Sequence, residues 1–315
     1  MNAGPPPLQP PALRPGDRVR LVAASSALPD LERLQAGLAV LASWGLELDD
    51  DPTRLPVRRW GYLAGRDAER AGDLLPDAGP GPVAALLACV RGGWGSARLL
   101  EQPLEAAGGW LLGFSDVTSL LWHRLAMGQG GAIHGPLLTT LAAEPAWSRE
   151  RLRALLFGEP LADLEGESWV GGQAEGPLLA ANLTVATHLL GTPHLPDLDG
   201  AILILEDVGE APYRLERMLT HWRLCGALQR LGGIGFGSFV GCDDPRDDDD
   251  DTPRFSLEQV IRERTADLGI PVLAGLPVGH GDVNAALPLG VRARLDADRG
   301  RLSVIAAGPG SFSRR

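Results

Sequence analysis

The sequence predicts an α/β fold whose N-terminal half forms a mainly parallel sheet. Two observations predict it: short apolar runs typical of buried strands, and segments of helical apolar periodicity between them. Strands that alternate with helices favour a parallel sheet covered on both faces. The expected strands of this half are 18–24, 83–90 and 110–114, and the expected helices are 30–45, 66–75 and a segment from about Ser96.

The second half of the chain has more hairpin character than the first. Residues 298–300 are typical of a hairpin turn, and Ser256 with Gln259 forms a capping box. Residues 144–175 are richer in Pro, Gly and charge, so we expect the boundary there, between domains 1–155 and 170–315. The expected helices are 178–190, 213–231 and 256–268, and the expected strands are 201–206, 234–242, 271–274 and the hairpin 291–306.

Composition excludes several classes of function. The chain of 315 residues has a net charge of −11, which argues against non-specific binding to nucleic acid or to an anionic membrane. All 29 basic residues are arginine, so a Ser–Lys dyad, a Schiff-base lysine and a phosphate-loop lysine are excluded. Any nucleophile must therefore be activated by histidine or a carboxylate.

Neither a metal site nor a disulfide framework is expected. Cys89, Cys225 and Cys242 are far apart and lack a CxxC pair. The acidic run 243–251 lacks the spaced pattern of a calcium loop, so a solvated loop is expected there. The first eleven residues have neither the basic start nor the apolar core of a signal peptide, and no apolar run approaches the ~20 residues of a membrane span. We therefore expect a cytoplasmic protein without a cofactor.

Ser115 is the candidate nucleophile. An apolar strand pattern ends at Gly113, and a helical pattern begins directly after the serine, as in a nucleophile elbow. The usual Gly-x-Ser-x-Gly elbow has glycine where Val117 stands. The alternative is a serine that only caps the helix, in a two-domain binding protein, since Ser is a preferred N-cap residue.

A serine nucleophile needs a base, and the base needs an orienting acid. His280 lies in a Gly-flanked loop after an apolar strand, which favours it as the base. His134, which we expect just after a helix, is a second histidine that could line a site. Glu206 ends an apolar strand, where a carboxylate is costly unless it is hydrogen-bonded. Alternatively, Glu206 caps a turn or pairs with Arg214 or Arg217. The chain order serine, acid, histidine is that of α/β-hydrolases.

An oxyanion hole needs two preorganised N–H donors. The amide of Asp116 is the natural first donor, and Gly92 or Gly93 is the natural second, because glycine permits close backbone approach to a ligand. A plain turn is the alternative for 91–95. A phosphate cradle is weaker, because neither Gly-x-Gly-x-x-Gly nor a Lys-Ser/Thr pair follows.

Taken together, these motifs resemble the LD-carboxypeptidases, a family of serine peptidases that includes muramoyltetrapeptide carboxypeptidase and the microcin-immunity peptidases. Each matching segment is short, but their order and spacing are specific and extend along almost the whole chain. The segments are 22–26, 62–67, 91–100, 113–116, 134–136, 182–184, 191–193, 205–210 with Tyr213 and Arg217, 279–280 and 287–290.

The resemblance implies an N-terminal parallel-sheet α/β domain that carries the nucleophile and a smaller, β-rich α+β C-terminal domain that carries the acid and the base. It implies Ser115 as nucleophile, Glu206 as charge-relay acid and His280 as general base, in a site between the two domains. It implies release of the terminal D-alanine from murein tetrapeptides during cell-wall recycling, without a metal, by a protein that is commonly a homodimer. A related amidase that destroys an acylated nucleotide antibiotic is the alternative.

The chain departs from the family pattern beside the expected cleft. Trp94 stands where the family often has tyrosine, and Ala180-Ala181 stand where it often has two glycines. We expect Trp94 to contact the substrate and Arg91 to bind its terminal carboxylate, because one positioned arginine can dominate locally in an anionic protein. These neighbours therefore bear on substrate preference.

Overall fold

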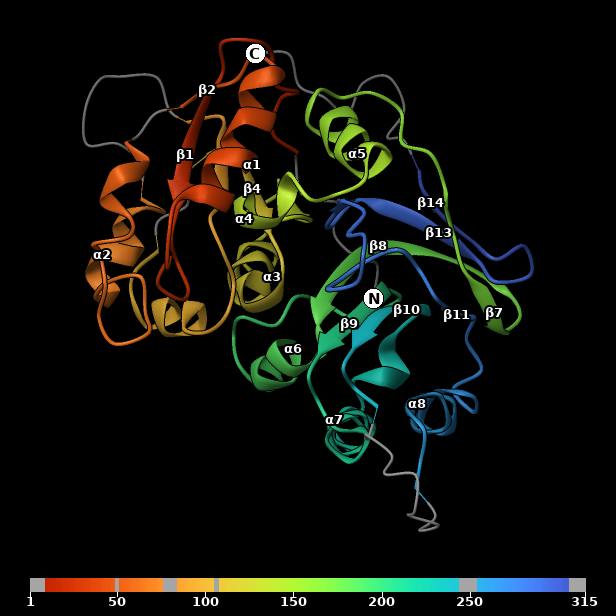
Figure 1. The fold of residues 1–315 in the computed structure, drawn as a ribbon. Coiled ribbons are helices and arrows are strands. Elements are labelled where there is room, and N and C mark those ends of the chain that lie inside the picture. Colours follow the sequence, from red (N-terminus) through yellow and green to blue (C-terminus); the bar gives the residue numbers. More distant parts are fainter. Residues whose placement is uncertain (1–8, 49–50, 76–83, 105–107, 244–253, 306–315) are drawn as a thin grey trace, which may run out of the picture.

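The structure, a computed structural model, describes residues 9–48, 51–75, 84–104, 108–243 and 254–305. Within these ranges it forms one sheet of six strands and one of eight, each with helices packed against it (Figure 1). This is the mixed α/β architecture that the sequence predicts. Val83 of an expected strand, residues 244–251 of the acidic run and Ala306 of the expected hairpin lie outside the described residues.

The first sheet has its functional edge where its parallel strands end. Its strands are β1 (Arg18–Val22), β2 (Glu47–Leu48), β3 (Leu86–Cys89), β4 (Trp110–Gly113), β5 (Ala132–His134) and β12 (Leu287–Pro288). The order is β12-β5-β4-β3-β1-β2, and only β12 is antiparallel to its neighbour. Ligands of such sheets bind at the carboxyl ends of the strands, where the loops after β1, β3 and β4 meet.

The helices of this half follow the predicted order. They are α1 (Glu32–Ser43), α2 (Asp67–Gly72), α3 (Thr118–Ala126), α4 (Leu138–Leu141) and α5 (Ala146–Leu156), with 3₁₀ turns η1 (Pro52–Arg54), η2 (Ser96–Glu101) and η3 (Ser115–Val117). At the start of α1, the Asp30 carboxylate accepts a hydrogen bond from the Glu32 amide at 3.1 Å. The helix expected from Ser96 is the 3₁₀ turn η2 instead, and α5 lies inside the stretch expected to hold the domain boundary.

The second sheet is parallel at its centre and antiparallel at its edges. Its strands are β6 (Leu164–Glu165), β7 (Glu167–Val170), β8 (Gln173–Asn182), β9 (Ile202–Val208), β10 (Gly233–Val240), β11 (Val272–Ala274), β13 (Arg292–Asp296) and β14 (Arg301–Val304). The order is β6-β14-β13-β8-β9-β10-β11-β7. The predicted hairpin is present as β13 and β14, which pair from Ala293 with Val304 to Asp296 with Arg301.

Three helices, α6 (Leu183–Leu189), α7 (Pro212–Leu224) and α8 (Leu257–Thr265), belong to this half, and η4 (Leu228–Arg230) follows α7. They lie below the second sheet in Figure 1. The helix expected over 213–231 ends at Leu224, shortly before Gly226, whose φ of 77° breaks the helical conformation. The helix expected over 256–268 is α8, and its capping box is present as predicted.

The predicted helix over 178–190 is wrong in its first part. Leu178, Leu179, Ala180 and Ala181 belong to β8 and are at most 2% exposed. A strand buried on both faces shows no polar alternation, so periodicity alone does not separate it from a buried helix. The helix begins only at Leu183, after the Asn182 side chain accepts a hydrogen bond from the Val185 amide at 3.1 Å.

The two sheets are joined by side chains of α3 and by β12. Trp122 of α3 donates from Nε1 to the Ala180 carbonyl of β8 at 3.0 Å and packs edge-on against Trp222 of α7. His123 of α3 lies within hydrogen-bond distance of His194, which follows α6 (Nδ1 to Nδ1, 2.9 Å). The helix that begins beside Ser115 is thereby fastened to the half that carries Glu206 and His280. The division into domains 1–155 and 170–315 stays a prediction.

Candidate active site

Ser115 lies in a strained turn between β4 and α3. Its φ of 62° is the only positive φ of a non-glycine residue in the described ranges, a conformation that costs roughly 1–2 kcal/mol. If Gly113 carried a side chain, its Cβ would lie 2.7 Å from Val117 Cγ1 and 3.1 Å from Cys89 Cβ, so the turn requires glycine there. No side-chain capping bond occurs at η3, which disfavours the interpretation of Ser115 as a helix cap.

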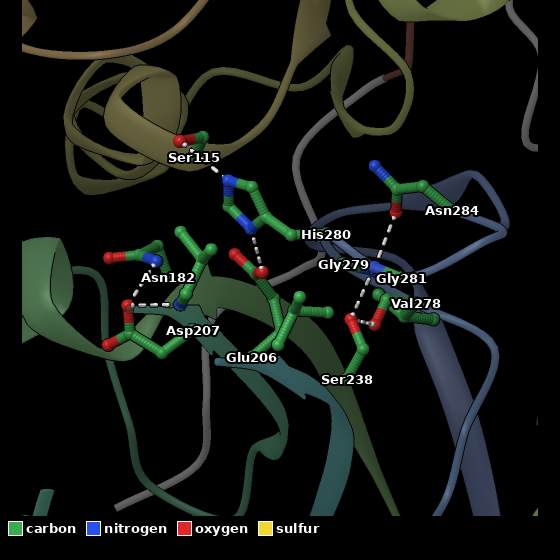
Figure 2. Close-up of polar contacts among 12 residues, drawn as sticks. Ser115, Asn182, Glu206, Asp207, Ser238, Val278, Gly279, His280, Gly281 and Asn284 are labelled. Atoms are coloured by element: carbon green, nitrogen blue, oxygen red, sulfur yellow. Dashed lines mark hydrogen bonds and ion pairs between the residues drawn. The ribbon is translucent and has the colours of Figure 1, made fainter. Parts of the chain in front are cut away.

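Ser115, His280 and Glu206 form a hydrogen-bonded chain, which we call the relay (Figure 2). Ser115 Oγ is 3.1 Å from His280 Nε2, and His280 Nδ1 is 2.6 Å from Glu206 Oε2. The three residues come from different elements: the turn after β4, the strand β9, and the loop after β11. The sequence intervals of 165 and 74 residues are closed only by the fold.

Glu206 is fully buried in β9, which continues to Val208 and therefore extends two residues beyond the expected strand end. Burial raises the pKa of its carboxyl above the ordinary value, and the hydrogen bond with His280 opposes that rise. Its Oε1 has no hydrogen-bond partner in the described part of the chain. Glu206 does not pair with Arg214, which instead contacts Glu210 at 3.3 Å. A buried carboxylate with one short contact to an imidazole is suited to orient the ring and to stabilise its protonated form.

The loop that carries His280 is fixed at several points. Gly279 has a φ of 112°, and a Cβ atom there lies 2.7 Å from Glu206 Oε2 and 2.7 Å from Ser238 Oγ. Ser238 Oγ accepts a hydrogen bond from the Gly281 amide at 2.9 Å and donates one to the Val278 carbonyl at 3.2 Å. Figure 2 shows these contacts on the side of the loop away from Ser115. The ring of His280 is thereby held in one place.

A second anchor for this loop comes from the first half of the chain. The Asn284 carbonyl Oδ1 accepts a hydrogen bond from the Gly279 amide at 3.0 Å. The Asn284 amide donates to Glu144 Oε2 at 2.9 Å, and Ser148 Oγ donates to the same oxygen at 2.8 Å. Burial raises the pKa of the Glu144 carboxyl. Glu144 and Ser148 flank the start of α5, so this anchor links the two halves.

The end of β8 is tied to both Asp207 and α3. Asn182 Nδ2 donates to Asp207 Oδ1 at 2.8 Å, and Thr184 Oγ1 donates to Asp207 Oδ2 at 2.8 Å. The Asn182 amide donates to Thr118 Oγ1 at 3.1 Å, three residues beyond Ser115. Both carboxylate oxygens of Asp207 thus accept hydrogen bonds from neighbouring residues, and the carboxylate that faces His280 is that of Glu206.

The residues expected to supply the oxyanion hole lie beside Ser115. A Cβ atom at Gly92 lies 3.1 Å from Ser115 Oγ, and one at Gly93, where φ is 106°, lies 2.3 Å from Ser26 Oγ. The Asp116 side chain accepts hydrogen bonds from Ser25 Oγ at 2.6 Å and from the Ser96 amide at 2.8 Å. The positive φ and the close Ser26 hydroxyl require glycine at 93, and a side chain at 92 would press directly on Ser115.

Arg91 and Trp94 lie on the same loop with different surroundings. Arg91 donates from Nη1 to the Ala27 carbonyl at 2.8 Å, so part of its guanidinium is engaged with the backbone. The Trp94 amide donates to Ser26 Oγ at 3.1 Å, and its ring is half exposed. Their predicted contacts with substrate stay predictions.

His134 is packed behind the relay. It lies in β5, whereas the sequence suggested a position just after a helix, and it is fully buried. The Phe114 ring lies between it and His280, with centroid distances of 5.7 and 4.7 Å. Burial lowers the pKa of His134 to about 3, assisted by the nearby His280. A neutral ring with this placement packs against the site and does not transfer protons at neutral pH.

Sequence reasoning missed the residues that hold the relay in place, above all Ser238, Asn284 and Glu144. They are single polar residues without a local motif, and the Glu144–Asn284 contact spans 140 residues. Only Asn284 lies near a catalytic candidate, four residues after His280. In the described part of the chain, no group of three or more His, Cys, Asp or Glu residues is arranged to hold a metal ion. No helix there is long and apolar enough to cross a bilayer.

Comparison with known proteins assigns the chain to a family. Residues 19–135 match the LD-carboxypeptidase N-terminal domain, and residues 175–295 match the LD-carboxypeptidase C-terminal domain. The chain belongs to the LD-carboxypeptidase family. The resemblance drawn from the sequence motifs is thereby confirmed, and with it the character of a serine-type peptidase family.

Two relatives and one solved structure illustrate how far this similarity extends. A putative carboxypeptidase of Synechocystis is 49% identical over 95% of this chain and 97% of its own length. The murein tetrapeptide carboxypeptidase of Pseudomonas aeruginosa is 37% identical over 90% of this chain and 94% of its own. The crystal structure of muramoyltetrapeptide carboxypeptidase from Oxalobacter formigenes matches with a TM-score of 0.77 and 28% identity, covering 90% of this LD-carboxypeptidase chain and 97% of that one.

Proposed function

We propose that this protein is a serine LD-carboxypeptidase that releases the terminal D-alanine from murein tetrapeptides in cell-wall recycling. The observation that carries the proposal is the relay, in which Ser115, His280 and Glu206 lie in hydrogen-bonding order at 3.1 and 2.6 Å. The relatives from Pseudomonas aeruginosa and Oxalobacter formigenes, which are named for tetrapeptide substrates, support the choice of substrate.

In the proposed reaction, His280 Nε2 takes the Ser115 hydroxyl proton as Oγ attacks the carbonyl carbon that precedes D-alanine. The amides of Asp116 and Gly93, or of Gly92, stabilise the negative oxygen of the tetrahedral intermediate. The C–N bond then breaks, and the imidazolium gives its proton to the departing D-alanine nitrogen. Glu206 holds the ring by Nδ1 and stabilises its positive charge throughout.

Water resolves the acyl-enzyme. His280 takes a proton from the water molecule as its oxygen attacks the ester carbon, and the proton returns to Ser115 Oγ when the tripeptide leaves. The free carboxylate of D-alanine needs a cation, and Arg91 is our candidate, with its Nη1 already held against the Ala27 carbonyl. Trp94 is the candidate for contacts with a part of the substrate remote from the scissile bond.

The proposal includes a cytoplasmic homodimer that needs no metal or cofactor and binds neither nucleic acid nor membrane. The net charge of −11 supports the exclusion of polyanionic partners. Light scattering coupled to gel filtration tests the dimer, and cell fractionation tests the location. Unchanged turnover after treatment with a chelator is the expected result for metal independence.

The immunity-type amidase is the weaker candidate. It needs the same relay and differs only in the pocket that holds the acyl group. Two relatives, 31% and 37% identical over 95% and 90% of this chain, are named as a probable murein peptide carboxypeptidase and a murein tetrapeptide carboxypeptidase, which favours the peptide substrate. Parallel assays with a murein tetrapeptide and an aminoacyl-sulfamoyl adenylate separate the two activities.

The direct test is release of D-alanine from a murein tetrapeptide, followed by mass spectrometry. Ser115→Ala is expected to lower turnover by roughly 10⁴–10⁶-fold with folding intact. Ser256→Ala is the matched control, because Ser256 caps α8 by accepting a hydrogen bond from the Gln259 amide. That variant is expected to lose about 1 kcal/mol of stability and no activity. Unchanged turnover of Ser115→Ala disproves the proposal.

A further inference from the structure

Exposed aromatic rings lie at the edge of the sheet that carries Ser115. Trp60 is 41% exposed, Tyr62 67% and Trp94 49%. They follow β2 and β3, whose carboxyl ends lie on the same edge of the sheet as the end of β4. Exposed aromatic side chains gathered near a site mark a binding surface more often than scattered ones do.

This surface is fixed close to the nucleophile. Gly92 lies against Ser115, because a Cβ atom added to Gly92 would be 3.1 Å from Ser115 Oγ. Trp94 follows two residues later. Ser26 connects the loops: its amide donates to the Gly92 carbonyl at 3.3 Å, its Oγ accepts from the Trp94 amide, and its backbone bridges to Leu63, which follows Tyr62. The backbone segments that carry Tyr62 and Trp94 are therefore held beside the loop that contacts the serine.

The rings differ in what already covers them. The guanidinium carbons of Arg66 and Arg98 lie 5.3 and 5.5 Å from the centre of the Trp60 ring, so that ring already has cationic neighbours. Tyr62 and Trp94 contact each other edge to face, with centroids 5.3 Å apart and an interplanar angle of 67°. About half or more of each of these two residues remains in solvent. We call Tyr62 and Trp94 the ledge.

The chemistry of the ledge suits a sugar ring. A tetrapeptide of alanine, glutamate and a diamino acid offers short or charged side chains, which gain little from a phenol or an indole. A pyranose presents C–H groups on its faces and hydroxyl groups on its rim, so it can pack on an aromatic ring while its polar rim stays in water. An amphipathic aromatic surface with one apolar face and wet surroundings is what such a ligand requires.

The distances agree with this assignment. In a muramoyl tetrapeptide, three residues separate the scissile bond from the sugar, which is about 10 Å of extended chain at roughly 3.3–3.6 Å per residue. Trp94 is two residues from Gly92, so its Cα lies at most about 7 Å from that of Gly92, and its indole extends further. We propose that Tyr62 and Trp94 form a subsite for the muramoyl sugar of the substrate, an inference that rests on the proposed function.

The test compares a free murein tetrapeptide with the same peptide carrying N-acetylmuramic acid. The wild-type protein is expected to show a kcat/KM about tenfold higher for the sugar-bearing peptide, a factor typical of one well-placed aromatic contact. Trp94→Ala and Tyr62→Ala are expected to bring the ratio of the two kcat/KM values towards one. Trp147→Ala is the matched control, because Trp147 is 48% exposed and lies on α5, and it is expected to keep the wild-type ratio.

Conservative variants guard against misfolding. Trp94→Phe and Tyr62→Phe keep a ring and are expected to retain most of the ratio. A wild-type ratio of one, or ledge variants that keep the tenfold ratio, overturns the sugar subsite and leaves the proposed function standing. If neither peptide is cleaved, the proposed function fails by itself. The subsite is then judged by calorimetric Kd values of Ser115→Ala for the two peptides, where a tenfold difference supports it and equal values overturn it.

Discussion

A Cβ atom added to Gly279 would lie 2.7 Å from Oε2 of Glu206, the oxygen that is hydrogen-bonded to His280 Nδ1. The buried acid therefore occupies the space that any side chain at position 279 needs. The residue before the proposed base must be glycine for two reasons, the φ of 112° and the presence of this carboxylate.

Gly279→Ala is accordingly expected to displace Glu206 or the His280 loop and to lower kcat/KM by roughly 100-fold or more, since misplacement of a catalytic group by about 1 Å can cost that much. Gly275→Ala is the matched control. Gly275 also has a positive φ, 66°, but nothing lies within 4 Å of its Cβ position, so this variant carries backbone strain without a clash. Kinetics and thermal unfolding of the two variants check the prediction, which fails if both lose activity equally.

The positive φ of Ser115 lowers the stability of the folded protein, and substitution of this residue should reveal the cost. Ser115→Gly is expected to be more stable than Ser115→Ala by about 1 kcal/mol, because glycine adopts a positive φ without strain. At Ser119, inside α3, the order should reverse by a similar amount, since glycine is the poorer helix former. Urea unfolding of the four variants tests both statements. A Ser115→Gly variant no more stable than Ser115→Ala shows that the turn is unstrained.

Glu206→Gln should affect stability and activity in opposite directions. Burial holds the folded-state pKa of Glu206 above its unfolded value, so the wild-type protein loses stability as the pH rises from the unfolded value through the folded one. Glutamine does not titrate, and we expect the variant to gain stability relative to wild type over this window and to keep the gain above it.

Its activity should fall by roughly 10²–10⁴-fold, because a neutral amide cannot stabilise the imidazolium. Unfolding in urea at a series of pH values from 4 to 8, with turnover at neutral pH, tests both effects. A stability difference that is constant with pH contradicts the assigned direction of the pKa shift.

Glu144 is expected to act as a positioning residue through Asn284 and Gly279. Glu144→Ala removes the acceptor of the Asn284 amide, and we expect kcat to fall by about 10–100-fold while KM changes little, since the substrate does not touch this side chain. Glu144→Gln keeps an acceptor oxygen and should restore most of the kcat. Glu150→Ala, on the exposed face of α5, is the control and should behave as wild type. A matching rise in KM argues instead for general unfolding of the loop.

The elements that the sequence predicts well are those with local signals. The turn at Ser115 is indicated by an apolar run, a glycine and a helical pattern that follow one another in the sequence. The hairpin around Asp298 is indicated by its own turn residues. The chain order of Ser115, Glu206 and His280, with the family motifs, predicted three residues that the fold then places in hydrogen-bonding order. Local patterns helped here because Ser115 directly follows a strand pattern, Glu206 lies near the end of one, and His280 lies in a loop flanked by glycines.

The features that escaped prediction depend on contacts distant in sequence. The strand β8 was taken for part of a helix because Leu178 to Ala181 are buried on both faces by neighbours that the local sequence does not reveal. Asn284 and Glu144 meet across 140 residues, and a single polar residue in a loop gives no sign of its partner. His134 lies in a strand because it pairs with Gly113 on one side and with Leu287, far along the chain, on the other.

The short strand β12 has a consequence for folding during synthesis. Leu287–Pro288 completes the first sheet beside β5, although the rest of that sheet is made from residues before position 135. During synthesis, which proceeds from the N-terminus and allows early segments to fold first, the strained serine emerges from the ribosome long before its histidine. A nascent chain therefore carries a nucleophile without a base, and hydrolytic competence arrives only as the last sheet position is filled.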